Sequence, residues 1–151
     1  MDIFRFLDWQ VYKDSKALFK LVYGIVSKLP KDVRYELGNQ IIRSSFSVIL
    51  NISEGSGKSS DRELGRYFDI SIGSPNETVA GMDILMDNKL ITEEDFNLVF
   101  QNAEGISKQL GGFKKKLWFF RKKVEVRKLS ILKFRNYNEI KRRIEFQPYL
   151  V

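Results

Sequence analysis

The stretch NISEGSGKSS, residues 51–60, sets a Gly-Lys-Ser triplet in a glycine-rich segment. A phosphate-binding loop has the pattern Gly-x-x-x-x-Gly-Lys-[Ser/Thr] and follows a β-strand. Counting back from Gly57, the first glycine of that pattern would be residue 52, which is Ile52. The preceding segment has the apolar periodicity of a helix rather than a strand. The stretch is therefore interpreted as a turn between two helices.

Apolar residues recur at helical spacing on both sides of this turn. Short links of turn-forming residues separate the periodic segments, which is typical of an up-down-up-down bundle. The predicted fold is therefore all-α, an antiparallel four-helix bundle. The four helices are expected at about residues 8–29, 32–54, 61–86 and 92–117.

Particular residues indicate where these helices begin and where one of them is interrupted. Asp8, Ser60 and Thr92 are expected N-caps, because their side chains can accept a hydrogen bond from the first helical turn. Ser60 and Glu63 have the spacing of a capping box. Pro75 conflicts with the third helix, since inside a helix it removes a backbone hydrogen bond and costs ~3 kcal/mol or more. We expect a kink there, or two helical pieces.

Glycines and a mixed pattern make other segments less regular. Gly38 lowers helix propensity by about 1 kcal/mol relative to Ala and permits a close approach by a neighbouring helix. Gly111 and Gly112 form a weak spot where the fourth helix is expected to bend or end. From Trp118 onward helix and strand patterns compete; helix is favoured, with a frayed end after Pro148.

The first two helices carry more apolar surface than a single bundle needs. Each has a second apolar stripe beside the first, with Phe19 and Tyr23 on one helix and Phe46 on the other. A helix in a four-helix bundle buries one stripe against its neighbours. The surplus predicts that copies of the chain associate with one another.

The chain contains no cysteine and no histidine. Disulfides, thiolate metal sites and cysteine nucleophiles are excluded, and a reducing cytoplasm fits this composition. The usual general base and the commonest metal ligand are also missing. No secretory signal and no apolar run of the ~20 residues of a spanning helix are visible. We expect a cytoplasmic protein with no cofactor and no membrane partner.

The net charge of +7 is unevenly distributed along the chain. Residues 1–112 hold 13 Lys/Arg and 16 Asp/Glu, a net charge of −3, whereas residues 113–151 hold 13 Lys/Arg and 3 Asp/Glu, a net charge of +10. This asymmetry divides the chain into a bundle domain, residues 1–117, and a basic, aromatic extension, residues 118–151. A basic segment of this kind is typical of contact with a polyanion.

The extension is interpreted as a nucleic-acid-binding segment, because cations neutralise phosphates and aromatic rings stack on unpaired bases. Packing of its rings on the bundle, charge compensation of the acidic body, and binding to acidic lipid are alternatives. The predicted phosphate contacts are Lys114, Lys115, Lys116, Arg121, Lys122, Lys123, Arg127, Lys128, Lys141, Arg142 and Arg143.

The segment QIIRSSFSVILNISEGSGKSSDRELGRYFDISIGSPNE, Gln40 to Glu77, resembles the 23S rRNA intervening-sequence (S23) family of four-helix-bundle proteins. The resemblance covers about residues 5–117 and implies a left-handed bundle that assembles as a ring-shaped homopentamer. The accessory protein of diversity-generating retroelements looks like a relative and implies binding to nucleic acid and a reverse transcriptase. The matching residues are Gln40, Arg43, Ser47, Asn51, Ile52, Glu54, Gly55, Gly57, Ser60, Glu63, Arg66, Phe68, Gly73, Ser74 and Glu77.

Five polar residues of this motif, Arg43, Ser47, Asn51, Glu54 and Glu77, are candidates for a shared site. One interpretation is a carboxylate cluster for catalysis or ligand binding. The favoured one is a hydrogen-bonded network, with Arg43 paired to Glu54 or Glu77, which fixes the register of the helices. Di-iron bundles need Glu-x-x-His pairs, so no metal site is expected, although an all-carboxylate magnesium site is an alternative.

The protein is predicted to be a non-enzymatic, homo-oligomeric bundle that binds nucleic acid, primarily RNA or rRNA. The alternative is a protein-interaction scaffold for a reverse transcriptase or another enzyme. A third hypothesis, an enzyme acting on phosphate compounds through Lys58, Glu54 and Glu63, is disfavoured because the loop motif fails and no base is evident.

Overall fold

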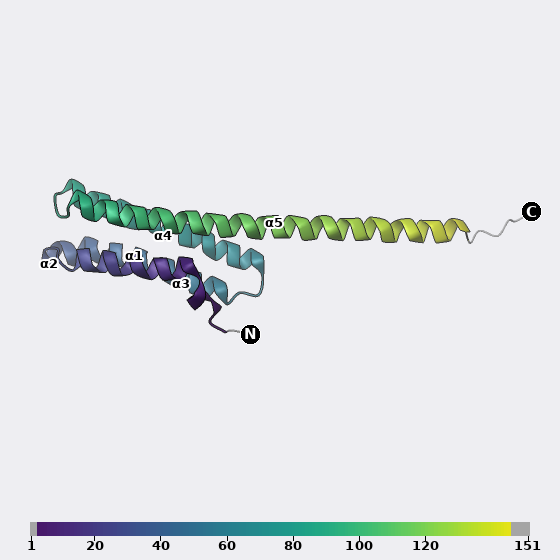
Figure 1. Ribbon diagram of the computed structural model, residues 1–151, viewed down its shortest axis with the longest axis horizontal. Helices are drawn as coiled ribbons and strands as arrows, with labels where there is room; N and C mark the ends of the chain where they lie inside the picture. The colour runs from purple at the N-terminus through teal and green to yellow at the C-terminus, as the bar shows by residue number, and fades with distance from the viewer. Residues whose placement is uncertain (1–2, 146–151) are drawn as a thin grey trace, which may run out of the picture. The chain divides into compact units, whose positions relative to one another are not determined.

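The computed structural model describes residues 3–145, with side chains described for all of these except residues 120, 121, 130, 133, 134 and 137–145. Within this range the chain is all-helical and has no strand, in agreement with the predicted fold class. Four long helices dominate it (Figure 1). The elements are η1 (Arg5–Asp8), α1 (Gln10–Val26), α2 (Lys31–Val33), η2 (Arg34–Gly38), α3 (Asn39–Ser56), α4 (Asp61–Asp87) and α5 (Glu93–Glu145).

The chain divides into two units between Lys115 and Lys116, inside α5. The first unit contains α1, α3, α4 and residues 93–115 of α5. The second begins with the remainder of α5 and carries the basic residues of the extension. The predicted domain boundary after residue 117 stays a prediction.

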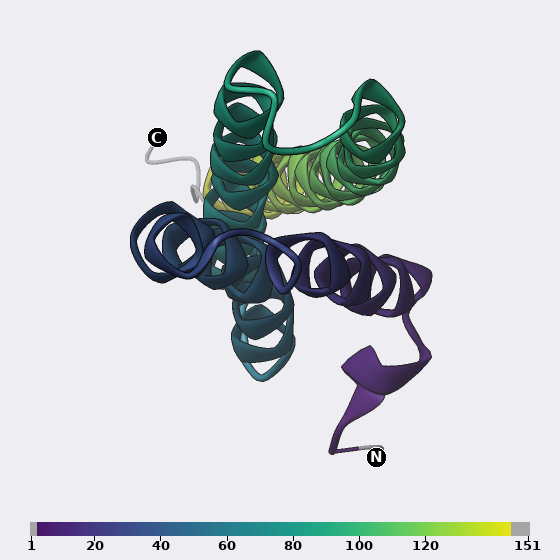
Figure 2. The same ribbon diagram turned by 90° about the vertical axis from the view of Figure 1, so that its left-hand side faces the viewer.

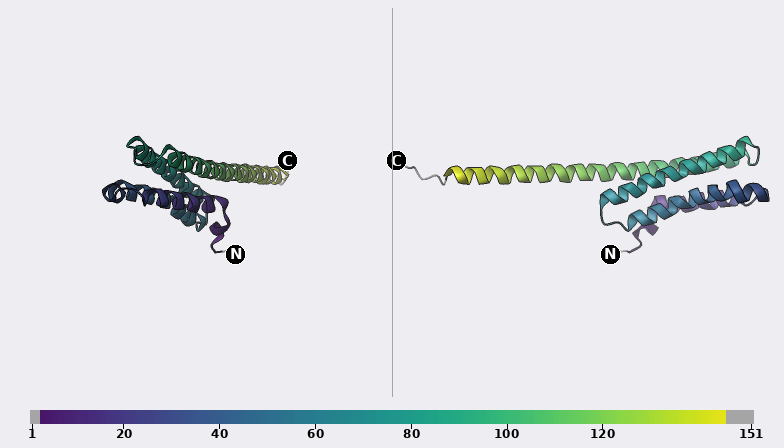
Figure 3. Two further views of the ribbon diagram at one scale, coloured as in Figure 1. Left: turned by 60° about the vertical axis from the view of Figure 1, so that its left-hand side comes forward. Right: turned by 180° about the vertical axis from the view of Figure 1, so that it is seen from behind.

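The core of the first unit is built from one apolar stripe on each long helix, at the spacing expected of amphipathic helices. Figure 2 shows α1, in purple, beside α3, in blue, and Figure 3 shows α3 and α4 side by side on either side of their connecting turn. The largest fully buried side chains are Val11, Leu18, Val22, Val26, Val48, Ile52, Phe68, Met82, Leu85, Val99, Ile106 and Leu110.

Two of the three predicted helix caps are present. The Glu63 backbone N–H donates to Ser60 Oγ at 3.2 Å, and Ser60 Oγ donates to Glu63 Oε2 at 2.7 Å. The Asp95 N–H likewise donates to Thr92 Oγ1 at 3.0 Å. The Asp8 cap is wrong, because Asp8 ends a 3₁₀ turn and the residue preceding α1 is Trp9.

Trp9, instead of Asp8, occupies the N-cap position of α1, and its ring packs against two other helices. Its ring lies 6.1 Å from the ring of Phe68 and 6.0 Å from that of Phe113, centroid to centroid. These contacts join the start of α1 to α4 and α5. Tertiary burial of a large aromatic side chain outweighs the ~1 kcal/mol that a capping side chain contributes.

The second predicted helix is interrupted near its start. A short α2 leads into one π-helical turn, η2, and only then into the regular helix α3. Gly38 ends the π turn, and a Cβ atom at this position would lie 2.6 Å from Val26 Cγ1 of α1. The prediction that Gly38 permits a close approach by a neighbouring helix is confirmed.

Pro75 does not divide the third predicted helix, since α4 continues without interruption from Asp61 to Asp87. The alternative of two helical pieces is therefore wrong. Pro75 is buried. Nearby, Thr78 Oγ1 donates a hydrogen bond within α4 to the Ser74 carbonyl at 3.0 Å. The Thr78 and Ser44 hydroxyl groups also form a 2.8 Å hydrogen bond that joins α4 to α3. Packing against α3 holds this part of α4 helical in spite of the lost backbone bond.

The helix α5 continues through Gly111 and Gly112, so these glycines do not end it. The preference for helix after Trp118 agrees with α5 as far as Glu145. The frayed end expected after Pro148 lies outside the described residues.

Candidate nucleic-acid interface

The turn between α3 and α4 is held by contacts of its own side chains. Lys58 Nζ lies 2.6 Å from Glu54 Oε1 and 5.0 Å from the centroid of the Tyr67 ring. Tyr67 OH donates to the same carboxylate oxygen at 3.4 Å, and the Arg5 guanidinium donates to the Ser56 carbonyl at 2.9 and 3.2 Å. The lysine of the Gly-Lys-Ser triplet is thus engaged by a carboxylate, as expected of an interhelical turn.

The pKa values of this pair move apart. The hydrogen bond from Lys58, and then its positive charge, lower the pKa of Glu54. The hydrogen bond to Glu54 raises the pKa of Lys58. Both groups therefore keep their charges across the neutral range, and neither is set up to exchange a proton with a substrate near pH 7.

The five polar residues of the family motif do not form one shared network. Asn51 Nδ2 donates to the Ser47 carbonyl at 2.8 Å and to Ser47 Oγ at 3.0 Å. Ser74 Oγ of α4 donates to Ser47 Oγ at 3.1 Å, so Ser47, which also accepts from Asn51, links α3 to α4. Glu54 pairs with Lys58 rather than with Arg43. Arg43 and Glu77 are exposed, and among the described residues neither forms an ion pair.

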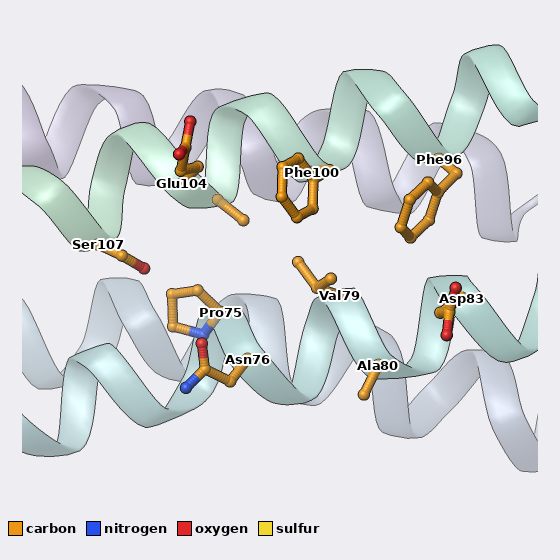
Figure 4. A pocket seen from close by; sticks show the side chains of 10 residues that line it. Pro75, Asn76, Val79, Ala80, Asp83, Phe96, Phe100, Glu104 and Ser107 are labelled. Atoms are coloured by element: carbon orange, nitrogen blue, oxygen red, sulfur yellow. The ribbon is translucent and has the colours of Figure 1, made fainter.

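A groove of about 460 Å³ lies between α4 and the first part of α5. Figure 4 shows the rings of Phe96 and Phe100 directed from α5 toward α4, where they face Val79. The two ring centroids are 6.0 Å apart. Asp83 and Glu104 are among its lining residues, so acidic residues border an apolar groove. We name this feature the α4/α5 groove, lined by Pro75, Asn76, Val79, Ala80, Asp83, Phe96, Phe100, Ala103, Glu104 and Ser107.

An apolar ridge lies on α1 and α3. The Phe19 ring is 6.1 Å from that of Tyr23 and 5.5 Å from that of Phe46, so the second stripes of the two helices meet. Tyr23 is 56% exposed, Phe46 44% and Leu50 49%. We name Phe19, Tyr23, Phe46 and Leu50 the α1/α3 ridge. The sequence identified the three aromatic members of this ridge.

The groove was not identified from the sequence. Its two aromatic members are Phe96 and Phe100 of α5. Their spacing of four residues places them on one side of a helix, which is a signal for a paired aromatic surface. Their partners on α4 are far away in the sequence, so the groove itself has no local pattern.

The second unit presents basic side chains along α5. Lys116, Lys122, Lys123, Arg127 and Lys128 are exposed, and within the described part of the chain none of them forms an ion pair. Of the predicted phosphate contacts in the first unit, Lys115 is exposed, whereas Lys114 pairs with Asp69 of α4. The side chains of Arg121, Lys141, Arg142 and Arg143 lie outside those that the structure describes.

Among the side chains that the structure describes, no group of three or more His, Cys, Asp or Glu is placed to hold a metal ion. In the described part of the chain, no helix is both long and apolar enough to cross a membrane.

The structure is similar to the crystal structure of a protein of unknown function from the S23 ribosomal protein family of Bacteroides thetaiotaomicron VPI-5482, with a TM-score of 0.65. The two chains are 23% identical, and the match covers 70% of this chain and 95% of the other, which establishes a shared fold. No match was found among curated proteins. A family model described as 23S rRNA-intervening sequence protein matches residues 7–112. Because this match spans well over half of the sequence and contains all of α1, α3 and α4, the chain belongs to the 23S rRNA-intervening sequence protein family.

Proposed function

We propose that this protein is a non-enzymatic, homo-oligomeric helical bundle that binds nucleic acid, primarily RNA, through the basic part of α5. The observation that carries the proposal is a row of exposed cations that form no ion pair among the described side chains, namely Lys116, Lys122, Lys123, Arg127 and Lys128. Cations without a carboxylate partner in the same chain are free to neutralise phosphates and release their counterions. The family match ends at residue 112, so this basic row lies outside the matched segment.

The bundle is proposed to be antiparallel, with an up-down-up-down order. The contacts between α3 and α4 support this, because residue numbers fall on α4 as they rise on α3: Ser44 meets Thr78, Ser47 meets Ser74, and Glu54 meets Tyr67. Between α1 and α5, Trp9 meets Phe113 and Asp14 meets Gln109, with the same reversal. The left-handed sense is an expectation from the family.

Association of copies is proposed to occur between the α1/α3 ridge of one copy and the α4/α5 groove of the next. α1 contacts α3 and α5, and α4 contacts α3 and α5, so ridge and groove belong to opposite sides of the four helices. A head-to-tail contact between two different surfaces generates a ring when the rotation closes. A ring of five copies is the number that the resemblance implies.

Charges beside the two surfaces support the same pairing. Lys16, Lys20 and Arg43 are exposed on the ridge helices, and Lys16 and Arg43 lie one turn from ridge residues. The groove contributes Asp83 and Glu104. Opposite charges at the rim of an apolar contact favour the correct partner and register more than they raise affinity.

A protein-interaction scaffold is the second candidate function. An apolar groove with carboxylates in its lining also fits a basic, aromatic helix of a partner enzyme. The suggested relation to the accessory protein of diversity-generating retroelements makes a reverse transcriptase one such partner. A cytoplasmic location belongs to the proposal and is supported by the absence of cysteine.

A salt titration of nucleic-acid binding tests the proposed function. The full chain is titrated into a fluorescein-labelled RNA oligonucleotide at several salt concentrations, and anisotropy gives the affinity. We expect affinity to fall steeply with salt. Replacing Lys122, Lys123 and Lys128 with Gln should reduce the slope of log affinity against log salt by about 2, since each neutralised phosphate of a single strand contributes roughly 0.7.

A matched variant separates the basic row from net charge. Replacing Lys13, Lys28 and Lys31 of the first unit with Gln removes the same number of charges from exposed positions. We expect that variant to keep the wild-type slope. Equal slopes for all three proteins, or no shift with any RNA or DNA, would contradict the proposed function.

A further inference from the structure

Two large aromatic rings on the second unit are exposed to solvent. Trp118 is 53% exposed and Phe119 63%. Their ring centroids lie 5.1 Å apart, with the ring planes at 80° to each other. Single apolar side chains are common on protein surfaces, but two adjacent exposed aromatic rings form a patch that suits a flat, π-rich partner.

Each of these rings is followed by a lysine one helical turn later. Lys122 Nζ lies 4.9 Å from the centroid of the Trp118 ring. Lys123 stands at the same spacing from Phe119, and residues four apart on a helix are neighbours on its surface. Both lysines are exposed. Ring and cation therefore recur as a pair, and we name Trp118, Phe119, Lys122 and Lys123 the aromatic–lysine face.

The chemistry of a nucleotide matches such a pair. A nucleobase offers a flat face for stacking, and the phosphate attached to it offers negative charge for a lysine. The base face is available only when the base is unpaired, because a duplex keeps its bases stacked on one another and presents edges and phosphates to a protein. A cation alone does not distinguish the two forms in this way, whereas an exposed ring does.

We infer that the aromatic–lysine face makes this protein prefer unpaired nucleic acid to duplex. Bases of a single strand stack on Trp118 and Phe119, and Lys122 and Lys123 contact the adjoining phosphates. This inference rests on the proposed function, which requires only that the basic row binds polyanions. The inference adds to that function the class of ligand, an unpaired strand, that this part of α5 prefers.

The arrangement of side chains favours a nucleic acid over a lipid surface. A helix that lies on a membrane collects its apolar side chains on one face and its cations on the other. Here the two kinds alternate around the helix, since Lys122 lies over the ring of Trp118 and Lys123 follows Phe119. The exposed apolar side chains of Val124 and Leu129 are likewise interspersed with Arg127 and Lys128.

The test compares one RNA sequence in two forms at one fixed salt concentration. A labelled, unstructured RNA oligonucleotide is offered to the full chain either alone or annealed to its complement, and anisotropy measures both affinities. We expect the single strand to bind about tenfold more tightly than the duplex, the size of effect typical of one stacked base. Replacing Trp118 and Phe119 with Ala should remove this preference by weakening single-strand binding alone.

Two matched variants complete the comparison. Val124→Ala with Leu129→Ala removes exposed apolar surface from the same helix without removing a ring, and it should leave the preference intact. Trp118→Phe keeps an aromatic surface and should retain tight single-strand binding. Stacking also quenches indole emission, so the wild-type protein should lose Trp fluorescence on binding the single strand, and Trp118→Phe, which retains only Trp9, should not.

The outcomes separate this inference from the proposed function. Equal affinities for single strand and duplex, unchanged by the Trp118 and Phe119 substitutions, would overturn the inference and leave the proposed function standing. No binding to either form would overturn both. A requirement for Trp118 and Phe119 in binding to vesicles of phosphatidylglycerol and phosphatidylcholine, with RNA affinity unaffected by their loss, would assign the face to a lipid surface and overturn the inference.

Discussion

At the scale of single residues, two glycines of α4 differ in what surrounds them. A Cβ atom on Gly81 would lie 2.5 Å from Ile41 Cγ1 of α3, too close for any real contact. A Cβ atom on Gly73 would meet nothing within 4 Å. The same residue type in one helix is therefore required at the first position for close packing and is dispensable at the second.

We predict that Gly81→Ala destabilises the protein by about 1–3 kcal/mol, the usual cost of overpacking. Gly73→Ala should instead stabilise it by about 0.5–1 kcal/mol, because Ala is the better helix former. Urea denaturation followed by circular dichroism measures both free energies of unfolding. Destabilisation of equal size by the two substitutions would show that space at Ile41 is not the cause.

The pair formed by Glu54 and Lys58 predicts a dependence of stability on pH. The lowered pKa of Glu54 means that its contribution is present at neutral pH and is lost as the pH falls through the folded-state pKa, below the ordinary range of a glutamate. The raised pKa of Lys58 means that its contribution is lost only as the pH rises through that value, above the ordinary range of a lysine. Between these limits the contribution is constant.

Glu54→Gln should therefore lower the melting temperature at pH 7 in low salt and have no effect in strong acid. The shift should be small and should shrink with added salt, because the pair is exposed and screened by ions. Glu36→Gln is the control, since Glu36 is exposed and forms no ion pair among the described side chains. A melting-temperature difference that persists unchanged in acid would argue against an electrostatic origin.

At the scale of helices, capping residues predicted where a helix starts when tertiary packing did not oppose them. Ser60 and Thr92 stand before α4 and α5 as capping chemistry predicts. Asp8 has the same chemistry, but Trp9, held by its aromatic contacts, precedes α1, so the N-cap lies one residue later than predicted. Pro75 is the opposite case, because packing between α3 and α4 preserves a helix that the local sequence weakens.

The cap at Ser60 provides the test at this scale. Ser60→Ala should destabilise the protein by about 1 kcal/mol, because it leaves a backbone N–H of the first turn of α4 without its acceptor. Ser59→Ala, one residue earlier and exposed, should change the free energy of unfolding by less than about 0.5 kcal/mol. Chemical denaturation of both variants measures the difference. Equal effects would show that the hydroxyl of Ser60 is not acting as a cap.

At the scale of the whole molecule, patterns within single helices were readable and surfaces built from distant segments were not. The second stripes of α1 and α3 were visible because Phe19, Tyr23 and Phe46 recur at helical spacing. The α4/α5 groove was invisible because residues 75–83 and 96–107 come together only in the folded chain. The charge asymmetry located the basic row, but the pairing of Lys114 with Asp69 needed the structure.

The ridge and the groove can be tested separately from folding. Phe46→Lys places a charge on the α1/α3 ridge, and Val79→Lys places one in the α4/α5 groove. Both should dissociate the assembly, because a buried unpaired charge is costly at an interface. Tyr35→Lys, at a position 77% exposed and outside both surfaces, should leave the assembly intact. Dissociation by all three would indicate a general loss of solubility or fold rather than a specific interface.

The molecular mass of the full chain in solution, measured by light scattering during size-exclusion chromatography, tests directly whether copies of the chain associate. One copy has a mass of 17.7 kDa. We expect a defined multiple of that mass, which falls to a single copy in the Phe46→Lys variant. A wild-type chain that elutes as a 17.7 kDa monomer at micromolar concentration would show that copies of the chain do not associate.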